Sequence, residues 1–159
     1  MHKLSISSWA HMWLFNLWVV STLTKELHFD EFFWVSIWGI IAWFLALWYS
    51  PEEIKEAFFD NIARLSDIYS FRSLNAKPLH EKIKRVTWNR KLWNTLIPLS
   101  LGVTSKKTWE NIVLSSKSHP EVDLSQAIFS SALLKIMRWP KFKIWEYWEC
   151  IDWAYFAFF

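Results

Sequence analysis

Hydrophobic and polar positions divide the chain into two long uncharged runs and a mixed remainder. The stronger run lies between Glu31 and Glu52 and reads FFWVSIWGIIAWFLALWYSP, twenty residues without a charge. As one helix rising about 1.5 Å per residue it would extend about 30 Å, the thickness of a bilayer's hydrocarbon core. Trp34 and Trp48 lie near its ends, where membrane–water interfaces favour tryptophan. A buried helix of a soluble domain is the alternative, but the pattern favours a transmembrane helix.

The weaker run covers residues 4–24 and also contains no Asp, Glu, Lys or Arg. Its apolar residues recur at helical spacing, so that one face is apolar and the other carries hydroxyls, His11 and Asn16. Such a helix either spans the membrane against a partner or lies in the interface. The two runs together predict a transmembrane helical hairpin over residues 1–50, with residues 25–31 as its turn.

Charge placement predicts an orientation for this hairpin. The turn holds one Lys and three acids, whereas residues 72–107 hold nine basic residues and one acid. Because Lys and Arg favour the side of synthesis, we expect both termini in the matrix and the chain in the mitochondrial inner membrane. Anionic lipid is a candidate partner of the basic stretch, and nucleic acid is a less favoured one. The candidate lipid-binding residues are Lys82, Lys84, Arg85, Arg90 and Lys91.

The remainder, residues 51–159, shows amphipathic helical patterns. The segment Ser50-Pro51-Glu52-Glu53 is typical of a helix start, because Ser50 and Glu53 can cap each other's backbone N–H groups. Further helices are predicted over 79–96, around 104–116, and from Asp123 towards Pro140. The predicted fold is therefore all-α, with an N-terminal transmembrane helical hairpin and a small peripheral helical region that ends in an aromatic tail.

Composition narrows the class of protein. Fourteen Trp and thirteen Phe accompany only two Gly, unlike an ordinary soluble enzyme, whose loops and phosphate-binding turns need glycine. Reading the codon UGA as tryptophan, as many mitochondrial genomes do, would produce such tryptophan usage, and this fits an organelle-encoded membrane subunit. A single Cys excludes a disulfide framework and a Cys-based metal cluster.

Catalytic motifs are absent from the sequence. The five histidines show no metal-ligand spacing, and with only Gly39 and Gly102 there is no phosphate loop and no glycine-flanked serine elbow. Cys150 lies among aromatics and is interpreted as a packed residue. We therefore predict no enzyme activity, cofactor or metal. The residues predicted to contact lipid or partner subunits are instead Trp34, Trp48, Ile54, Phe58, Ile62, Leu65, Trp148, Trp153 and Phe159.

One stretch resembles a known family. The sequence Trp48-Tyr49-Ser50-Pro51 followed by EEIKEAFFDNIARLSDIYSFRS, within residues 32–73, is similar to the membrane-exit region of subunit b of F-type ATP synthases. This resemblance implies a non-catalytic structural subunit that holds the stator, although four prolines after residue 77 interrupt a long stalk helix. An accessory subunit of a respiratory complex such as NADH dehydrogenase is the first alternative. A basic organellar ribosomal protein is the second.

Overall fold

The computed structural model describes residues 2–6, 13–35, 39–61, 77–132, 143–144, 147–148 and 150–152. In this part of the chain the fold is α/β, so the prediction of an all-α fold is wrong. The main sheet contains β1 (Lys3–Ile6), β2 (Glu31–Val35), β3 (Leu99–Ser105), β4 (Asn111–Ser115) and β7 (Cys150–Asp152). A second sheet pairs β5 (Lys143–Ile144) with β6 (Tyr147–Trp148). The helices are α1 (Trp13–Glu26), α2 (Gly39–Ala46), α3 (Pro51–Asn61), α5 (Lys77–Thr87), the 3₁₀ helix η3 (Leu92–Asn94) and α6 (Leu124–Ala132).

The sheet is mixed, with β3 at its centre. Strands β1, β2 and β3 run parallel in that spatial order, and β4 and β7 are both antiparallel to β3. Along β3, β2 pairs with residues 99–102, β7 with 103–105, and β4 with 100–104. Since β4 occupies one edge of β3, β2 and β7 lie end to end along the other edge.

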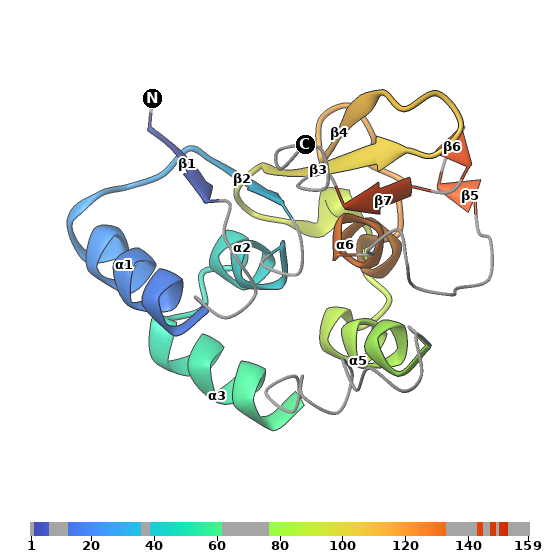
Figure 1. Ribbon diagram of the computed structural model, residues 1–159. Helices are drawn as coiled ribbons and strands as arrows, with labels where there is room; N and C mark the ends of the chain where they lie inside the picture. Colours follow the sequence, from blue (N-terminus) through green and yellow to red (C-terminus); the bar gives the residue numbers. More distant parts are fainter. Residues whose placement is uncertain are drawn as a thin grey trace.

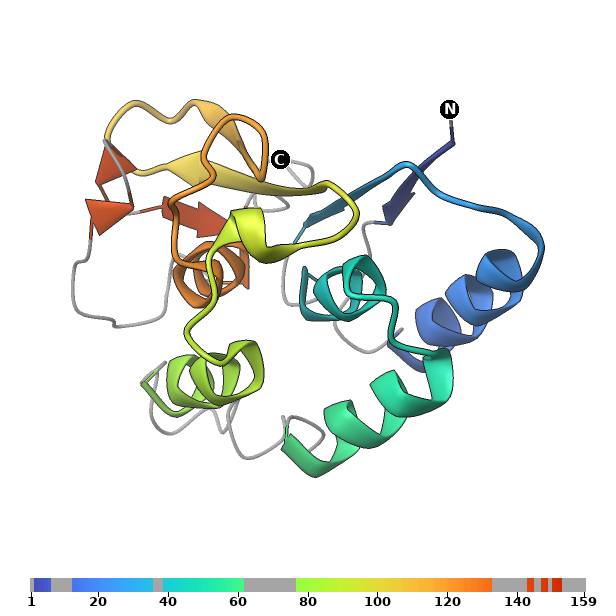
Figure 2. The same cartoon turned by 180° about the vertical axis from the view of Figure 1, so that it is seen from behind.

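The helices gather on one side of the sheet, as Figures 1 and 2 show. Helix α2 contacts β2 and β3, and α6 contacts β3 and β7. Helices α3 and α5 lie farther from the sheet, α3 against α1 and α2 and α5 against α6. A continuous cluster of buried apolar side chains extends from Leu4 of β1 to Cys150 of β7. Helix α2 therefore lies at the centre of the core.

The stronger uncharged run belongs to three elements instead of one transmembrane helix. Residues 32–35 lie in β2, residues 39–46 form α2, and Pro51 begins α3. Helix α2 is about 12 Å long at about 1.5 Å per residue. Among the residues that the structure describes, no helix combines the length and the apolar character needed to cross a bilayer. The predicted transmembrane hairpin, its location in the inner membrane and its matrix-side termini are therefore contradicted.

Burial explains why the pattern was misleading. A parallel strand between two neighbours is buried on both faces, and a helix enclosed by a sheet and other helices is apolar all round. Trp34 in β2 and Trp43 in α2 are both fully buried. Placed one after the other, such a strand and such a helix produce the same uncharged run as a membrane helix. The weaker run likewise includes β1 and most of α1.

Two helix starts that the sequence predicted are confirmed. The Glu53 N–H donates to Ser50 Oγ (3.3 Å), and the Ser50 N–H donates to Glu53 Oε2 (2.8 Å), at the start of α3. The Gln126 N–H donates to Asp123 Oδ1 (3.1 Å) at the start of α6. Each bond joins residues three apart, so that local sequence is sufficient to specify it.

Two other helix predictions need correction. Helix α5 ends at Thr87, so the helix expected over 79–96 is shorter than predicted. The short helix expected around residues 104–116 is wrong, because this stretch is the hairpin between β3 and β4, in which the Ser105 N–H donates to the Glu110 carbonyl (3.0 Å). The short apolar run Ile112-Val113-Leu114, with two β-branched residues, was the signal that favoured a strand.

Candidate active site

The ends of β2 and β7 meet on β3. Val35, the last residue of β2, pairs with Gly102, and Asp152, the last residue of β7, pairs with the next residue of β3, Val103. The two strands reach this point from opposite directions, because β2 is parallel and β7 antiparallel to β3. In α/β folds, ligands bind at the carboxyl ends of parallel strands. This point is therefore the first place to look for chemistry.

Neighbouring elements hold the backbone at this point. The buried hydroxyl of Ser131 in α6 donates to the carbonyl of Gly102 (2.7 Å). On the opposite edge of β3, Gly102 pairs with Val113 of β4. A position fixed from three directions is a rigid base on which functional groups can be oriented.

Helix α2 begins close to this point, after a connection of three residues. Its first residue is Gly39, where a Cβ atom would lie 2.7 Å from Leu101 Cδ2 and 3.5 Å from Ile128 Cγ1. Glycine at this position therefore lets the helix approach β3 and α6 closely. The amino-terminal end of a helix favours negative charge, because its first N–H groups have no intrahelical partner. Here that end follows the carboxyl end of β2.

The sequence supplies a hydroxyl to the turn between β2 and α2. Ser36 is the only hydroxyl-bearing residue between Phe32 and Leu47. Residues 36–38 lie outside the described residues, so Ser36 is placed only by its position in the sequence, directly after Val35, the last residue of β2. A serine in a tight strand-to-helix turn is the nucleophile position of many hydrolases. No sequence motif marks Ser36, because Trp34 and Trp38 stand where the G-x-S-x-G motif has glycine.

The described histidines lie elsewhere. His2 precedes β1, His28 precedes β2, and His119 follows β4, so all three are at the amino-terminal edge of the parallel strands. His80 lies on α5, with its ring 4.9 Å from that of Phe129, and burial lowers its pKa. His11 falls outside the described residues. The strand register brings the backbone of Asp152 beside the end of β2, while its side chain is outside the described part of the structure.

Cys150 lies two residues before Asp152, but it has the properties of a packed residue. It is 2 % exposed, and burial raises the pKa of its thiol to about 11. A thiol that stays protonated near neutral pH is a poor nucleophile. In the described part of the chain, no three His, Cys, Asp or Glu side chains are grouped in a way that could hold a metal ion.

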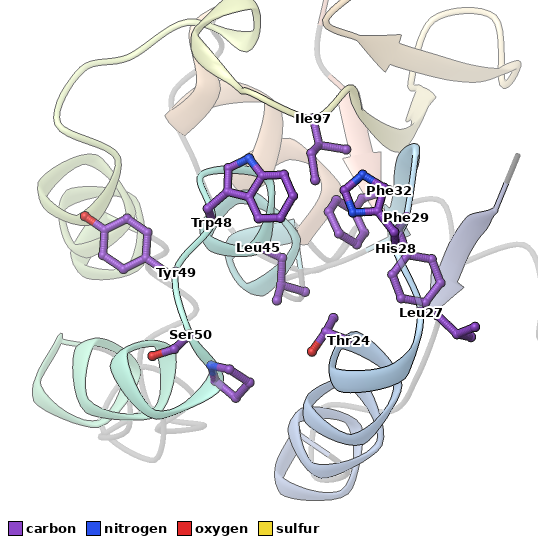
Figure 3. A pocket seen from close by; sticks show the side chains of 11 residues that line it. Thr24, Leu27, His28, Phe29, Phe32, Leu45, Trp48, Tyr49, Ser50 and Ile97 are labelled. Carbon is purple, nitrogen blue, oxygen red and sulfur yellow. The ribbon is translucent and has the colours of Figure 1, made fainter.

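A cavity of about 200 Å³ lies away from the candidate site, where α2 ends. Figure 3 shows its lining side chains, which come from α1, the segment before β2, and the connection between α2 and α3. His28 stacks on Trp48 there, with ring centroids 5.4 Å apart. The lining contains no carboxylate and no thiol. The lining does hold His28 and the hydroxyls of Thr24 and Ser50. The Thr24 hydroxyl, however, donates to the Val20 carbonyl, and the Ser50 hydroxyl donates to the Glu53 carboxylate.

The residues predicted to contact lipid or partner subunits are in different environments. Trp34 and Ile54 are fully buried, whereas Trp48 is 60 % exposed. Phe58 lies in α3 and Trp148 in β6, both without a described side chain. The remaining four lie outside the described residues: Ile62, Leu65, Trp153 and Phe159.

The predicted lipid-binding cations lie on α5 and just after it. Lys84 and Arg85 are exposed on the helix, and Lys82 is half-buried. After the helix, Arg90 lies over the ring of Trp88 (5.4 Å to the centroid) and Lys91 forms an ion pair with Glu121. Their binding of anionic lipid stays a prediction.

Comparison with known proteins gives no family: no protein-family model and no curated protein matches this chain.

Proposed function

We propose that this protein is a serine hydrolase that cleaves carboxylic esters through a covalent acyl-enzyme. In this proposal the nucleophile is Ser36, which lies outside the described residues, and the base is the carboxyl group of Asp152, of which only the backbone is described. The observation that carries the proposal is the register of β2 and β7, whose last residues pair with the adjacent residues Gly102 and Val103 of β3. This register supports a serine and a carboxylate, far apart in sequence, meeting at one point of the sheet.

The proposed reaction follows from the chemistry of these two groups. The Asp152 carboxylate accepts the proton of the Ser36 hydroxyl while the serine oxygen attacks the ester carbonyl carbon. Backbone N–H groups at the start of α2 stabilise the oxyanion. The C–O bond to the alcohol then breaks, and the alcohol leaves with the proton from Asp152. Water attacks the acyl-enzyme by the same path, releasing the carboxylic acid and restoring Ser36.

An apolar acyl group is the substrate part that best suits the site. The side chains packed at the start of α2 are Leu101 and Ile128, both aliphatic. A carboxylate base without a described histidine also distinguishes the site from a Ser-His-Asp triad, in which histidine carries the proton. The proposed arrangement is therefore a serine–aspartate dyad acting on acyl esters.

Ester hydrolysis takes the place of the two membrane-subunit hypotheses, the stator and the respiratory subunit, because the transmembrane hairpin on which they were based is contradicted. The ribosomal hypothesis and the expectation that the chain has no turnover stay predictions. A direct assay decides between absence of turnover and ester hydrolysis.

The test uses a fluorophosphonate probe and p-nitrophenyl esters of increasing acyl length. We expect the probe to label protein purified from its own cells on the peptide that contains Ser36. Ser36→Ala should abolish labelling and ester turnover, and Asp152→Asn should lower turnover by about 10²–10⁴-fold, the usual contribution of a general base.

Ser21→Ala is the matched control. The Ser21 hydroxyl donates to a carbonyl within α1 (2.8 Å) and is far in sequence from the proposed dyad. This variant should keep full labelling and turnover, with circular dichroism confirming that all variants are folded. Labelling that persists in the folded Ser36→Ala variant, or full turnover in Asp152→Asn, would contradict the proposed dyad.

A further inference from the structure

Three tryptophans have backbone conformations that glycine favours. The backbone angle φ is 65° at Trp48, 48° at Trp88 and 61° at Trp109. Asn89, at 55°, is the one other non-glycine residue with positive φ in the described part of the chain. The left-handed region is sterically disfavoured for bulky side chains and is normally taken by Gly, Asn or Asp. Asn89 fits this rule, and the three tryptophans do not.

Trp48 occupies the glycine position of a helix-terminating motif. At the end of α2, the Trp48 N–H donates to the Leu45 carbonyl (3.0 Å) and the Tyr49 N–H to the Phe44 carbonyl (3.1 Å). These two bonds define a Schellman motif, whose left-handed residue is usually Gly and sometimes Asn. The tryptophan side chain is 60 % exposed.

Trp88 and Trp109 occupy turn positions with the same preference. The Arg90 N–H donates to the Thr87 carbonyl (3.0 Å), and both central residues of this turn have positive φ, as in a type I′ turn. In the hairpin between β3 and β4, the Trp109 N–H donates to the Ser105 carbonyl (2.8 Å), which makes Trp109 the left-handed residue before β4. Gly, Asn and Asp dominate such positions, and tryptophan is not among the residues that favour them.

Two buried tryptophans provide independent evidence that some tryptophan positions do not suit tryptophan. Trp34 and Trp43 are fully buried, and the indole Nε1 of each has no hydrogen-bond partner. A buried indole N–H normally finds an acceptor, because leaving it unpaired loses the hydrogen bond it made to water. At both positions the tryptophan therefore leaves a buried polar atom unpaired, a cost that a residue without an indole would not have.

Composition fits the same explanation. At an average usage of about 7 %, a chain of 159 residues holds about 11 glycines. This chain has two, together with fourteen tryptophans. One cause would account for both the deficit of glycine and the excess of tryptophan. A codon that is translated as tryptophan in this sequence would be decoded as glycine in the cell. UGA is the codon that fits this explanation, because its meaning differs between genetic codes, whereas UGG always encodes tryptophan.

We infer that Trp48, Trp88 and Trp109 mark glycine residues of the native protein, encoded by UGA and decoded as glycine. The same decoding at Trp34 and Trp38 would turn residues 34–38 into Gly-Val-Ser-Ile-Gly, which matches the G-x-S-x-G pattern around a hydrolase nucleophile. The inference thus deepens the proposed function but does not rest on it, because the three backbone conformations are remote from Ser36 in sequence.

The test is to sequence the gene and to analyse peptides of the protein purified from its own cells by tandem mass spectrometry. We expect UGA at positions 48, 88 and 109, and peptide masses with glycine at each. Tryptophan in these peptides, from UGG or from UGA codons, would overturn the inference. The hydrolase assay is a separate measurement: a glycine-containing protein without fluorophosphonate labelling contradicts the proposed function and leaves the decoding intact.

Discussion

Each end of helix α2 has a position that suits glycine, but only the position at the start is occupied by glycine. At its start, Gly39 lies where a Cβ would come 2.7 Å from Leu101 Cδ2, so the position is occupied by the residue that fits. At its end, Trp48 holds φ of 65°, the conformation that glycine adopts most readily. Backbone geometry therefore identifies a position that favours glycine even where the sequence has tryptophan, the largest side chain.

The two positions favour glycine for different physical reasons. At Gly39 the constraint comes from neighbours, because β3 and α6 leave no room for a side chain. At Trp48 the side chain is mostly exposed, so the constraint is in the backbone itself. Substitutions at the two ends should therefore change the free energy of unfolding in opposite directions.

The largest effect is expected at the start of α2. Gly39→Val should lower the free energy of unfolding by about 2–3 kcal/mol, because it forces a branched side chain into a filled core. Urea denaturation measures this change. Shortening the obstructing side chain should restore part of the loss, so Leu101→Ala and Gly39→Val together should cost less than the sum of the two. Strict additivity would mean that Leu101 is not the obstruction.

A smaller effect of opposite sign is expected at the end of α2. In a chain synthesised with tryptophan at position 48, Trp48→Gly should raise the free energy of unfolding by about 1–2 kcal/mol, because it removes the steric cost of the left-handed conformation. The variant also loses the ring stacking between Trp48 and His28, which reduces the increase in the free energy of unfolding.

Trp93→Gly is the matched control for Trp48→Gly. Trp93 is similarly exposed, 56 % against 60 %, but its φ is not positive. This control should lose about 0.5–1 kcal/mol, since glycine then only adds freedom to the unfolded chain. Equal changes in the two variants would show that φ at Trp48 carries no cost.

The smallest effect is expected in the connection that follows α2. Ser50→Ala should lower the free energy of unfolding by about 1 kcal/mol, because α3 loses its cap. Hydrogen bonds from Ser50 also lower the pKa of Glu53. The resulting stability is present above the unfolded-state pKa and is lost as pH falls through the lower folded-state value.

The pH dependence provides the control for this prediction. Glu53→Gln keeps the Ser50 hydroxyl as a cap but removes the titrating group, so it should flatten the dependence of stability on acid pH. Ser50→Ala keeps the backbone N–H of residue 50, the largest cause of the lowered pKa of Glu53, and should flatten this dependence less. Chemical denaturation at a series of pH values from neutral to acid measures it. An unchanged acid dependence in both variants would show that the contact between Ser50 and Glu53 does not persist in solution.

Only part of the candidate site could be predicted from the sequence. Ser36 was identifiable only as the single hydroxyl between Phe32 and Leu47, which is a weaker signal than the glycine-flanked serine of a nucleophile turn. Trp34 and Trp38 concealed that signal, because the motif expects glycine at these positions. Asp152 could not be assigned by any local pattern. Its relation to β2 depends on β3, which pairs with both strands.

What the sequence determined by itself is local. The starts of α3 and α6 follow from hydrogen bonds between residues three apart, Ser50 with Glu53 and Asp123 with Gln126, and these contacts need no partner from elsewhere in the chain. Only the tertiary structure decided whether the uncharged run spans a membrane or divides into a buried strand and a buried helix. Both arrangements exclude charge from every side, so hydrophobicity cannot distinguish them, whereas the pairing of Phe32 with Leu99 does.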